Sequence, residues 1–213
     1  MPVQYNMNPF SVLKIIYGDT TDGFEREEFE TNESERGIVP PFLLKDFLFK
    51  YAYLPVNRQS KSVKFFHPNL MTVMRFSAEN IGELDLLCVG RVGEYQIAVK
   101  NEQSEDPRVF LVYLSTQSDT QVLPSDDIIS ELIKVMLCNL LLTMKDAVIA
   151  ETPEDAVRLL RENGVDLDEI RCDPNLSREY SINYSEETQT FAVAEFVKGE
   201  FFRFFFVKST DFK

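Results

Sequence analysis

Residues 84–100 read LDLLCVGRVGEYQIAVK, and this stretch decides the fold class. An apolar run at 84–89 leads into the glycine-containing sequence GRVG at 90–93, and a second apolar-rich segment, YQIAV, follows at 95–99. Two apolar segments joined by a short turn predict a pair of antiparallel strands, because a tight turn connects strands that run in opposite directions. The fold is therefore expected to contain an antiparallel β-sheet.

Further strands are expected on the C-terminal side of this hairpin. The sequence RVFLVYL, residues 108–114, is almost continuously apolar and predicts a strand in the interior of a sheet. Near the C-terminus, the apolar segments EYSINY, TFAVAEFV and FFRFFFV are separated by the short polar connections SEETQ and KGE. Residues 178–207 therefore predict a β-meander.

A first helix is expected in residues 40–57, PPFLLKDFLFKYAYLPVN. The two prolines favour a helix that starts at Pro41 or Phe42, because proline suits the first turn and not the interior of a helix. Residues 10–18, FSVLKIIYG, are apolar and fit either a helix or a strand.

Two more helices are expected in the second half of the chain. One is predicted from Ser125, a candidate N-cap, to Met144, with its start at the surface and its end in the interior. The other lies in TPEDAVRLLRENG, where Thr152 is the expected cap and Gly164 the stop signal.

The order of these elements indicates an α+β fold. Helices and strands occur in separate runs, so we expect a single domain over residues 1–213, in which helices pack against a mostly antiparallel sheet, with residues 1–32 as an N-terminal extension. The apolar content of 44% and charged content of 27% are ordinary for a globular protein. Phe occurs 18 times and Trp is absent, so Phe and Tyr are expected to supply the aromatic packing.

The charge of the chain is strongly negative, at −13, with 35 acidic and 22 basic residues. This argues against direct binding to nucleic acid or to an anionic membrane surface, since both need basic patches. It is compatible with a basic protein partner, and equally with acidity that serves only solubility. Residues 25–36, EREEFETNESER, carry a local charge of −4 and are typical of a solvated segment.

The three cysteines, Cys88, Cys138 and Cys172, lie far apart and form no CxxC pair. They are expected to be reduced thiols packed as small apolar side chains. The first ten residues, MPVQYNMNPF, lack the pattern of a secretory signal, and the longest uncharged apolar stretch, 135–144, is about half the length needed to cross a bilayer. A cytoplasmic location is expected.

No catalytic, cofactor-binding or metal-binding residues are predicted. The single histidine, His67, lies in FFHPN with no partner motif nearby and is interpreted as a loop residue. The sequence contains no nucleophile elbow, phosphate-binding loop or dinucleotide-binding motif. An enzyme that uses only carboxylates is left open.

Three aromatic side chains of the expected helix do not fit its core-facing side. Phe42, Phe49 and Tyr53 fall on the same arc as the charged residues. Either an N-terminal segment or a loop covers them as a second core layer, or they form an exposed aromatic strip of the kind that binds a partner. The predicted partner-binding surface combines this strip with the acidic segment: Glu25, Glu27, Glu28, Glu30, Phe42, Phe49 and Tyr53.

The proline-led helix, the strand hairpin and the sequence EDPRVF that follows it together resemble the SUKH superfamily, which contains fungal cell-wall-assembly regulators and bacterial immunity proteins. The resemblance covers most of residues 33–207, although this chain lacks the Trp that family members often carry in the hairpin. The residues that carry it are Pro41, Leu44, Tyr51, Asn57, Asp106, Pro107, Val109 and Phe110.

The resemblance implies a SUKH-like fold and a non-enzymatic immunity protein. Such a protein binds and neutralises a cognate polymorphic toxin, often a nuclease, in the cytoplasm. A basic protein toxin is therefore the expected partner. The alternatives are a regulatory or scaffolding module of the same fold that is not linked to a toxin, and an unrecognised enzyme.

Overall fold

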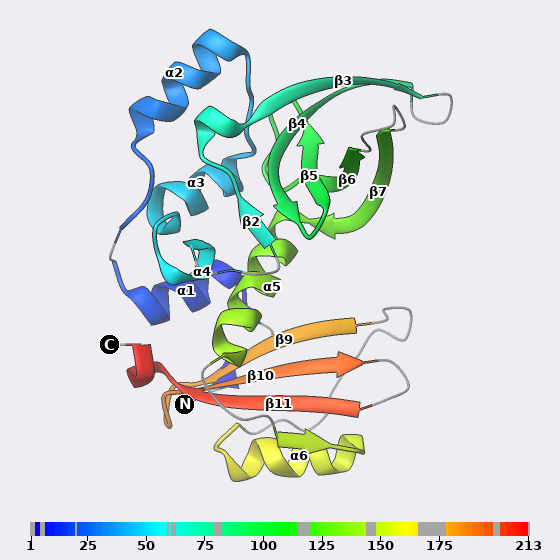
Figure 1. The fold of residues 1–213 in the computed structure, drawn as a ribbon. Coiled ribbons are helices and arrows are strands. Elements are labelled where there is room, and N and C mark those ends of the chain that lie inside the picture. The colour runs from blue at the N-terminus through cyan, green and yellow to red at the C-terminus, as the bar shows by residue number, and fades with distance from the viewer. Residues whose placement is uncertain are drawn as a thin grey trace. The chain divides into compact units, whose positions relative to one another are not determined.

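The computed structural model describes residues 3–4, 7–19, 21–58, 60, 63–78, 82–114, 120–143, 148–165, 178–197 and 201–212. The chain forms two compact units (Figure 1). The central unit comprises residues 20–136, and the terminal unit comprises residues 1–19 and 137–213. Each unit contains one antiparallel sheet and helices, which confirms the predicted α+β fold with mostly antiparallel strands.

The sheet of the central unit contains the predicted hairpin. Its strands follow the order β2 (Val63–Phe65), β4 (Gly82–Val92), β5 (Tyr95–Lys100), β6 (Arg108–Leu114) and β7 (Thr120–Ile128), and β3 (Thr72–Ala78) also pairs with β4. Val92 lies opposite Tyr95, so the turn of the hairpin is Gly93–Glu94. Gly93 has a φ of +56°, which glycine adopts without strain. As its apolar sequence predicted, β6 has a neighbouring strand on each side.

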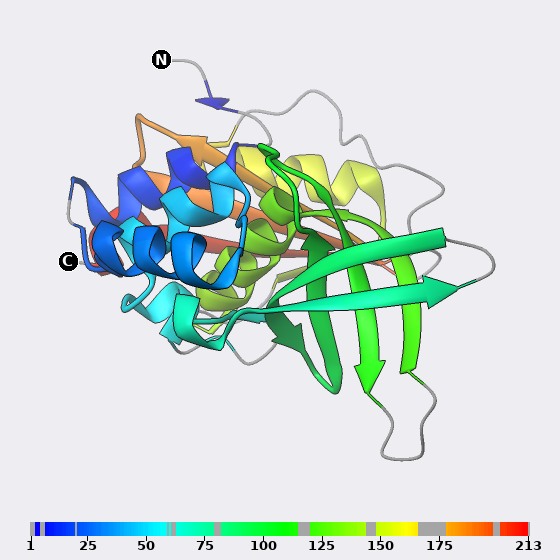
Figure 2. The ribbon, with the colours of Figure 1, turned by 90° about the horizontal axis from the view of Figure 1, so that it is seen from above.

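Two other strands share one edge of β4, and the pairing on its other edge is irregular. β3 pairs with residues 82–88 and β2 with residues 90–92, and the register against β5 shifts between Cys88 and Gly90. A Cβ atom at Gly90 would lie 2.6 Å from the carbonyl oxygen of Lys64, so glycine allows β2 to approach this closely. Figure 2 shows β3 and the start of β4 running across β5, β6 and β7.

Helix α3 (Phe42–Tyr51) starts at the predicted residue and packs on this sheet. Leu44, Phe47 and Leu48 are fully buried, and the ring centroid of Phe47 lies 5.8 Å from that of Phe65 in β2. The helix ends earlier than the apolar sequence suggested. A separate short helix, α4 (Pro55–Arg58), follows it.

The loop between β5 and β6 fixes the N-terminus of α3. The backbone N–H groups of Phe42 and Leu43 donate to the carbonyl oxygens of Ser104 and Glu105, at 3.0 and 3.2 Å. Asn101 in the same loop accepts from the N–H of Val39 at 2.7 Å and donates to the carbonyl of Gly37. The loop therefore satisfies backbone groups that a helix start leaves without partners.

Helix α5 (Ile129–Leu142) starts later than predicted, so Ser125 as its N-cap is wrong. Residues 120–128 instead form β7, which pairs with β6. The cap comes from a distant part of the sequence: Asp106 accepts hydrogen bonds from the backbone N–H of Ser130, at 3.0 Å, and from its hydroxyl. The predicted end at Met144 lies outside the described residues, and the described helix ends at Leu142.

The terminal unit contains the predicted β-meander. Its strand order is β1 (Val3–Gln4), β9 (Arg178–Ser185), β10 (Thr190–Val197), β11 (Phe201–Lys208) and β8 (Val148–Ala150). Residues 10–18 belong to a helix, α1 (Pro9–Tyr17), rather than to a strand. A short 3-10 helix, η2 (Ser209–Phe212), follows β11.

Helix α6 (Pro153–Glu162) of the terminal unit has the predicted ends. The hydroxyl of Thr152 accepts from the N–H of Asp155 at 3.1 Å and donates to the carboxylate of the same residue at 2.9 Å. Gly164 has a φ of +79° just after the helix. Ala156 and Leu160 of α6 pack in one apolar cluster with Ala192, Ala194 and Phe204 of the sheet.

The terminal sheet also buries one carboxylate. Glu195 of β10 is 1% exposed and forms a salt bridge with Arg203 on the neighbouring strand β11. The hydroxyl of Tyr180 on β9 donates to the same carboxylate at 3.1 Å. Since both partners come from adjacent strands, the group ties three strands together rather than forming an open site.

We predict that Asp106→Ala lowers the free energy of unfolding by about 1–2 kcal/mol, because the substitution removes the cap of α5. The Ser125→Ala variant is the matched control, since the hydroxyl of Ser125 makes only exposed hydrogen bonds with Asp127 and its loss should change stability by less than about 0.5 kcal/mol. Urea denaturation measures both values. A larger loss for Ser125→Ala than for Asp106→Ala would contradict this account of the helix start.

We also predict that Cys88 and Cys138 do not react with a disulfide-exchange reagent in the folded chain. Both side chains are buried, and burial raises the pKa of the Cys88 thiol to about 12, so almost no reactive thiolate of Cys88 forms at pH 8. Cys172 lies outside the described residues, so the test uses the Cys172→Ser variant. We expect the reagent to react with the two thiols only at the rate of global unfolding. Rapid reaction of either thiol in the native state would contradict this expectation.

Candidate functional site

Helix α2 (Arg26–Arg36) corrects the interpretation of residues 25–36 as a wholly solvated segment. One side of the helix is buried: Phe29 is fully buried and Asn32 is 7% exposed. The glutamates lie around the rest of the helix, and Glu25, Glu27 and Glu30 are exposed. A single apolar anchor therefore docks an otherwise acidic helix onto the protein.

The C-terminal end of α2 is held by the loop around the 3-10 helix η1 (Pro68–Leu70). The guanidinium of Arg36 donates to the carbonyl oxygens of Pro68, Asn69 and Met71, at 3.3, 2.9 and 2.6 Å. The side chain of Asn32 donates to the side-chain oxygen of Asn69 at 2.7 Å. These bonds fix the position of α2 because a guanidinium shared among several carbonyls permits few orientations.

The N-terminal end of α2 is held by the segment that precedes it. The N–H groups of Asp22 and Phe24 donate to the carbonyl oxygens of Lys50 and Leu48, at 2.8 and 3.0 Å. Between them, a Cβ atom at Gly23 would lie 2.2 Å from the carbonyl oxygens of Leu48 and Phe49. Only glycine therefore lets this segment lie directly against α3.

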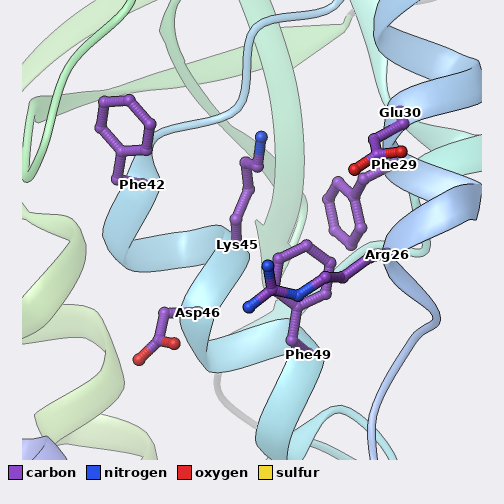
Figure 3. A pocket seen from close by; sticks show the side chains of 7 residues that line it. All are labelled: Arg26, Phe29, Glu30, Phe42, Lys45, Asp46 and Phe49. Atoms are coloured by element: carbon purple, nitrogen blue, oxygen red, sulfur yellow. The ribbon is translucent and has the colours of Figure 1, made fainter.

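A groove of about 280 Å³ lies between α2 and α3 (Figure 3). Phe49 is half-buried there: its ring centroid lies 4.8 Å from that of Phe29, edge to face, and the guanidinium carbon of Arg26 lies 5.4 Å from it. At the rim, Phe42 is 51% exposed. The lining residues are Arg26, Phe29, Glu30, Phe42, Lys45, Asp46 and Phe49.

The charges around the groove are partly paired. Lys45 forms a salt bridge with Glu33, and Asp46 forms one with Lys50 at 2.8 Å. Glu30 is exposed, and in the described part of the chain its carboxylate has no hydrogen bond or ion pair. The groove thus offers one unpaired carboxylate beside aromatic rings.

The structure brings three of the seven predicted partner-binding residues, Glu30, Phe42 and Phe49, to this groove. Of the two alternatives for the aromatic side chains, Phe49 is covered, since α2 lies over it. Phe42 is exposed. Glu25 and Glu27 are exposed and do not line the groove.

The remaining two predicted residues, Glu28 and Tyr53, lie beside a different aromatic group. Tyr53 is 47% exposed and contacts the ring of Phe24 edge-on at 5.1 Å. Phe24 in turn contacts the imidazole of His67, whose Nε2 atom lies 3.5 Å from the carboxylate of Glu28. Glu28 therefore contributes to packing as well as to the acidic surface.

Sequence reasoning missed Arg26, Phe29, Lys45 and Asp46 as lining residues. Their spacing contained the signal, because residues 26, 29 and 30 share one face of a helix and residues 42, 45, 46 and 49 share another. The spacing of residues 26, 29 and 30 could not be interpreted as a helix face, because residues 25–36 were not expected to form a docked helix.

His67 takes part in local packing and hydrogen bonding. Its Nδ1 atom accepts from the backbone N–H of Asn69 at 3.2 Å, and its ring packs on Phe24 with centroids 4.4 Å apart. Within the described ranges, no group of three His, Cys, Asp or Glu side chains is arranged to hold a metal ion. Among the described residues, no helix is long and apolar enough to cross a membrane.

One surface ion pair on the central sheet shifts the pKa values of its two side chains. The guanidinium of Arg75 donates to Asp85 at 2.9 Å, which lowers the pKa of that carboxyl and raises the pKa of Arg75. Both side chains are exposed and pair across strands β3 and β4. The pair joins β3 to β4 and does not border the groove.

No protein-family model, curated protein or solved structure matches this chain. The SUKH assignment therefore stays a prediction. Several residues that carry the resemblance hold the fold: Leu44 and Val109 are buried, Asp106 caps α5, and the amide of Asn57 joins the carbonyl of Ala52 to the N–H of Phe65. None of the eight residues lines the groove.

We predict that Gly23→Ala lowers the free energy of unfolding by about 1–3 kcal/mol and loosens α2, because the new methyl group collides with backbone atoms of α3. Asp22→Ala is the control, since the exposed neighbour keeps its backbone hydrogen bond. Hydrogen exchange should be faster for the amides of α2 in Gly23→Ala than in the control. Equal exchange and equal stability in the two variants would show that the close contact at Gly23 does not hold the groove together.

Proposed function

We propose that this protein is a non-enzymatic immunity protein that binds and neutralises a basic protein toxin in the cytoplasm. The observation that carries the proposal is the combination of two exposed aromatic side chains, Phe42 at the start of α3 and Tyr53 just after its end, with the acidic exposed side of α2. Buried aromatic anchors surrounded by charge are typical of residues that dominate binding energy at protein interfaces. The resemblance to the SUKH superfamily supports the same function.

Binding at this surface would use both components. Burying the exposed half of one aromatic side chain contributes about 1 kcal/mol, so two such residues supply a modest apolar anchor. The acidic side chains add long-range attraction, which speeds encounter with a basic partner more than it strengthens the final complex. Because α2 and α3 are held at both ends, little ordering cost accompanies binding.

A nuclease is a suitable toxin for this surface. Its substrate-binding cleft must be basic to hold phosphate groups, and exposed carboxylates complement that charge. The carboxylates of Glu25, Glu27 and Glu30 are exposed along α2 and are available for this role. The protein would then inhibit the toxin by covering its cleft, with no chemistry of its own.

The test is co-expression of the chain with the protein encoded by the adjacent gene, followed by co-purification and a toxicity assay. The proposal expects a stable complex and protection of the host cell from that protein. Absence of any complex with the neighbouring gene products would contradict it. A complex with a non-toxic neighbour would instead support a regulatory or scaffolding module.

We predict that Glu25→Lys, Glu27→Lys and Glu30→Lys, combined in one variant, slow association with the toxin about ten-fold or more at low salt. The dissociation rate should change less, and the difference in association should shrink at high salt as the Debye length falls. Stopped-flow or surface plasmon resonance measurements at two salt concentrations provide the rates.

The matched control combines Glu94→Lys, Glu162→Lys and Glu187→Lys. These glutamates are also exposed and give the same net charge, but they lie in turns or at the end of α6. If the control slows association as much as the α2 variant, net charge alone explains the rate and α2 is not the steering surface.

A further inference from the structure

We propose that one end of the central sheet, beside the β4–β5 turn, binds a second copy of this chain. This surface, the hairpin patch, lies on strands β4 to β7. The contact is separate from the proposed function, because the toxin is proposed to bind at α2 and α3. The residues of the patch are Val92, Tyr95, Leu111, Tyr113, Gln121 and Leu123.

The alternation of side chains places the patch on one face of the sheet. Ala98 of β5 and Val112 of β6 belong to an apolar cluster on the opposite face. Successive side chains of a strand point to opposite faces, so Tyr95, Leu111 and Tyr113 point away from that cluster. The patch therefore lies on the other side of the sheet from the cluster.

Four side chains of the patch form a contiguous array across β5, β6 and β7. The ring centroids of Tyr95 and Tyr113 lie 5.6 Å apart, and Leu111 lies directly opposite Leu123. Tyr95 is 37% exposed and Leu123 is 44% exposed, while the other two are half-buried. These side chains form one apolar surface and are not isolated exposed residues.

The patch continues a face that is buried elsewhere. Ile97 and Val99 follow Tyr95 on the same side of β5, and both are fully buried. Val109 precedes Leu111 on the same side of β6 and is buried as well. The protein therefore covers one end of this face with its own residues and leaves the hairpin end open.

The composition of the patch is typical of the centre of a protein interface. None of its six side chains is charged, although 27% of the residues in the chain are. Interface centres are depleted of charged residues and enriched in tyrosine, and homodimer interfaces are the more apolar class.

The charge of the chain favours a second copy as the partner at this surface. Two copies that each carry a net charge of −13 repel one another, so they can form a stable contact only where acidic side chains do not face each other. The patch meets this requirement, and in the turn beside it Glu94 is balanced by Arg91. A two-fold contact brings the same apolar patch from both copies, whereas a basic partner gains no attraction there.

The two copies are expected to meet face to face rather than through their sheet edges. Strand β7 lies at the edge of the central sheet, and Pro124 is exposed in the middle of this strand. Proline has no backbone N–H group to offer an added strand, and prolines in edge strands oppose pairing of this kind.

The test is sedimentation equilibrium of the full chain under reducing conditions. The expected result is a monomer–dimer equilibrium with a dissociation constant on the order of 100 μM, as suits a small interface. The average mass should rise from 24.6 kDa toward twice that value with concentration. Added salt should tighten the dimer about two- to five-fold, because it screens the repulsion between acidic copies. A chain that is still monomeric at about 1 mM would overturn the proposal.

Two variants test whether the hairpin patch forms the contact. Leu123→Glu should weaken the dimer about ten-fold or more, because it brings carboxylates together at an apolar contact, and Tyr95→Ala should do the same by removing a ring. The matched control is Ile149→Glu, which adds the same charge at a 57% exposed position of β8 and should change the dissociation constant less than about two-fold. Equal weakening by Leu123→Glu and Ile149→Glu, with urea midpoints like that of the wild type, would overturn the role of the patch.

NMR of the unaltered ¹⁵N-labelled chain locates the contact without any variant. Spectra below and above the dissociation constant should differ at the amides of residues 92–96, 111–113 and 121–123, and not at those of residues 26–53. Concentration-dependent shifts confined to other residues would overturn the proposal. Patch amides that shift only when the protein encoded by the adjacent gene is added would assign the patch to that partner and also overturn self-association.

The outcome separates from that of the proposed function. A dimer that captures no toxin would sink only the immunity function. Capture of a toxin by a chain that stays monomeric at all concentrations would sink only the dimer.

Discussion

The loop at residues 101–107 is the constraint on which the central unit depends. Its carbonyl oxygens accept from the first amides of α3, the side chain of Asn101 holds the segment at 37–39, and Asp106 caps α5. One short loop of the sheet thereby fixes the starts of two helices and the connection between α2 and α3. Because helix ends leave backbone groups without partners, a loop that satisfies two such ends fixes where both helices begin.

This constraint explains why an acidic helix can present a defined surface. With α3 fixed at its N-terminus by the loop, the segment at 22–24 and the contacts of Arg36 hold α2 against the rest of the unit. Phe29 is buried in the process, and Phe49 becomes half-buried beneath Arg26. What remains exposed is Phe42, Tyr53 and the glutamates, which is a composition suited to binding a basic protein.

The sequence predicted the elements whose signals are local. The hairpin at 84–100, the start of α3 and the two ends of α6 follow from apolar patterns, prolines and caps within a few residues. The predicted start of α5 was wrong because the residue that caps the helix, Asp106, lies 24 positions from Ser130 in the sequence. Only the fold brings Asp106 to the start of the helix. Likewise, two separate antiparallel sheets could not be distinguished from one, since strand patterns do not say which strands pair.

For the candidate site, the residue types were easier to predict than their arrangement. The sequence placed Phe42, Phe49 and Tyr53 off the core-facing side but left open whether they are covered or exposed. Phe42 and Tyr53 are exposed, whereas the covering of Phe49 required α2 to form and dock. That docking depends on one buried side chain, Phe29, in an otherwise charged segment, and on the absence of a side chain at Gly23. Neither feature stands out in a sequence that reads as a solvated acidic block.

The most direct test of the central claim, that α2 and α3 form the docking surface, is hydrogen exchange of the chain alone and in complex with the protein encoded by its adjacent gene. The account predicts slower exchange on complex formation at residues 25–30 and 42–53, and unchanged exchange in the β-meander at 178–207. Protection confined to the strands of either sheet, with α2 and α3 unaffected, would contradict it.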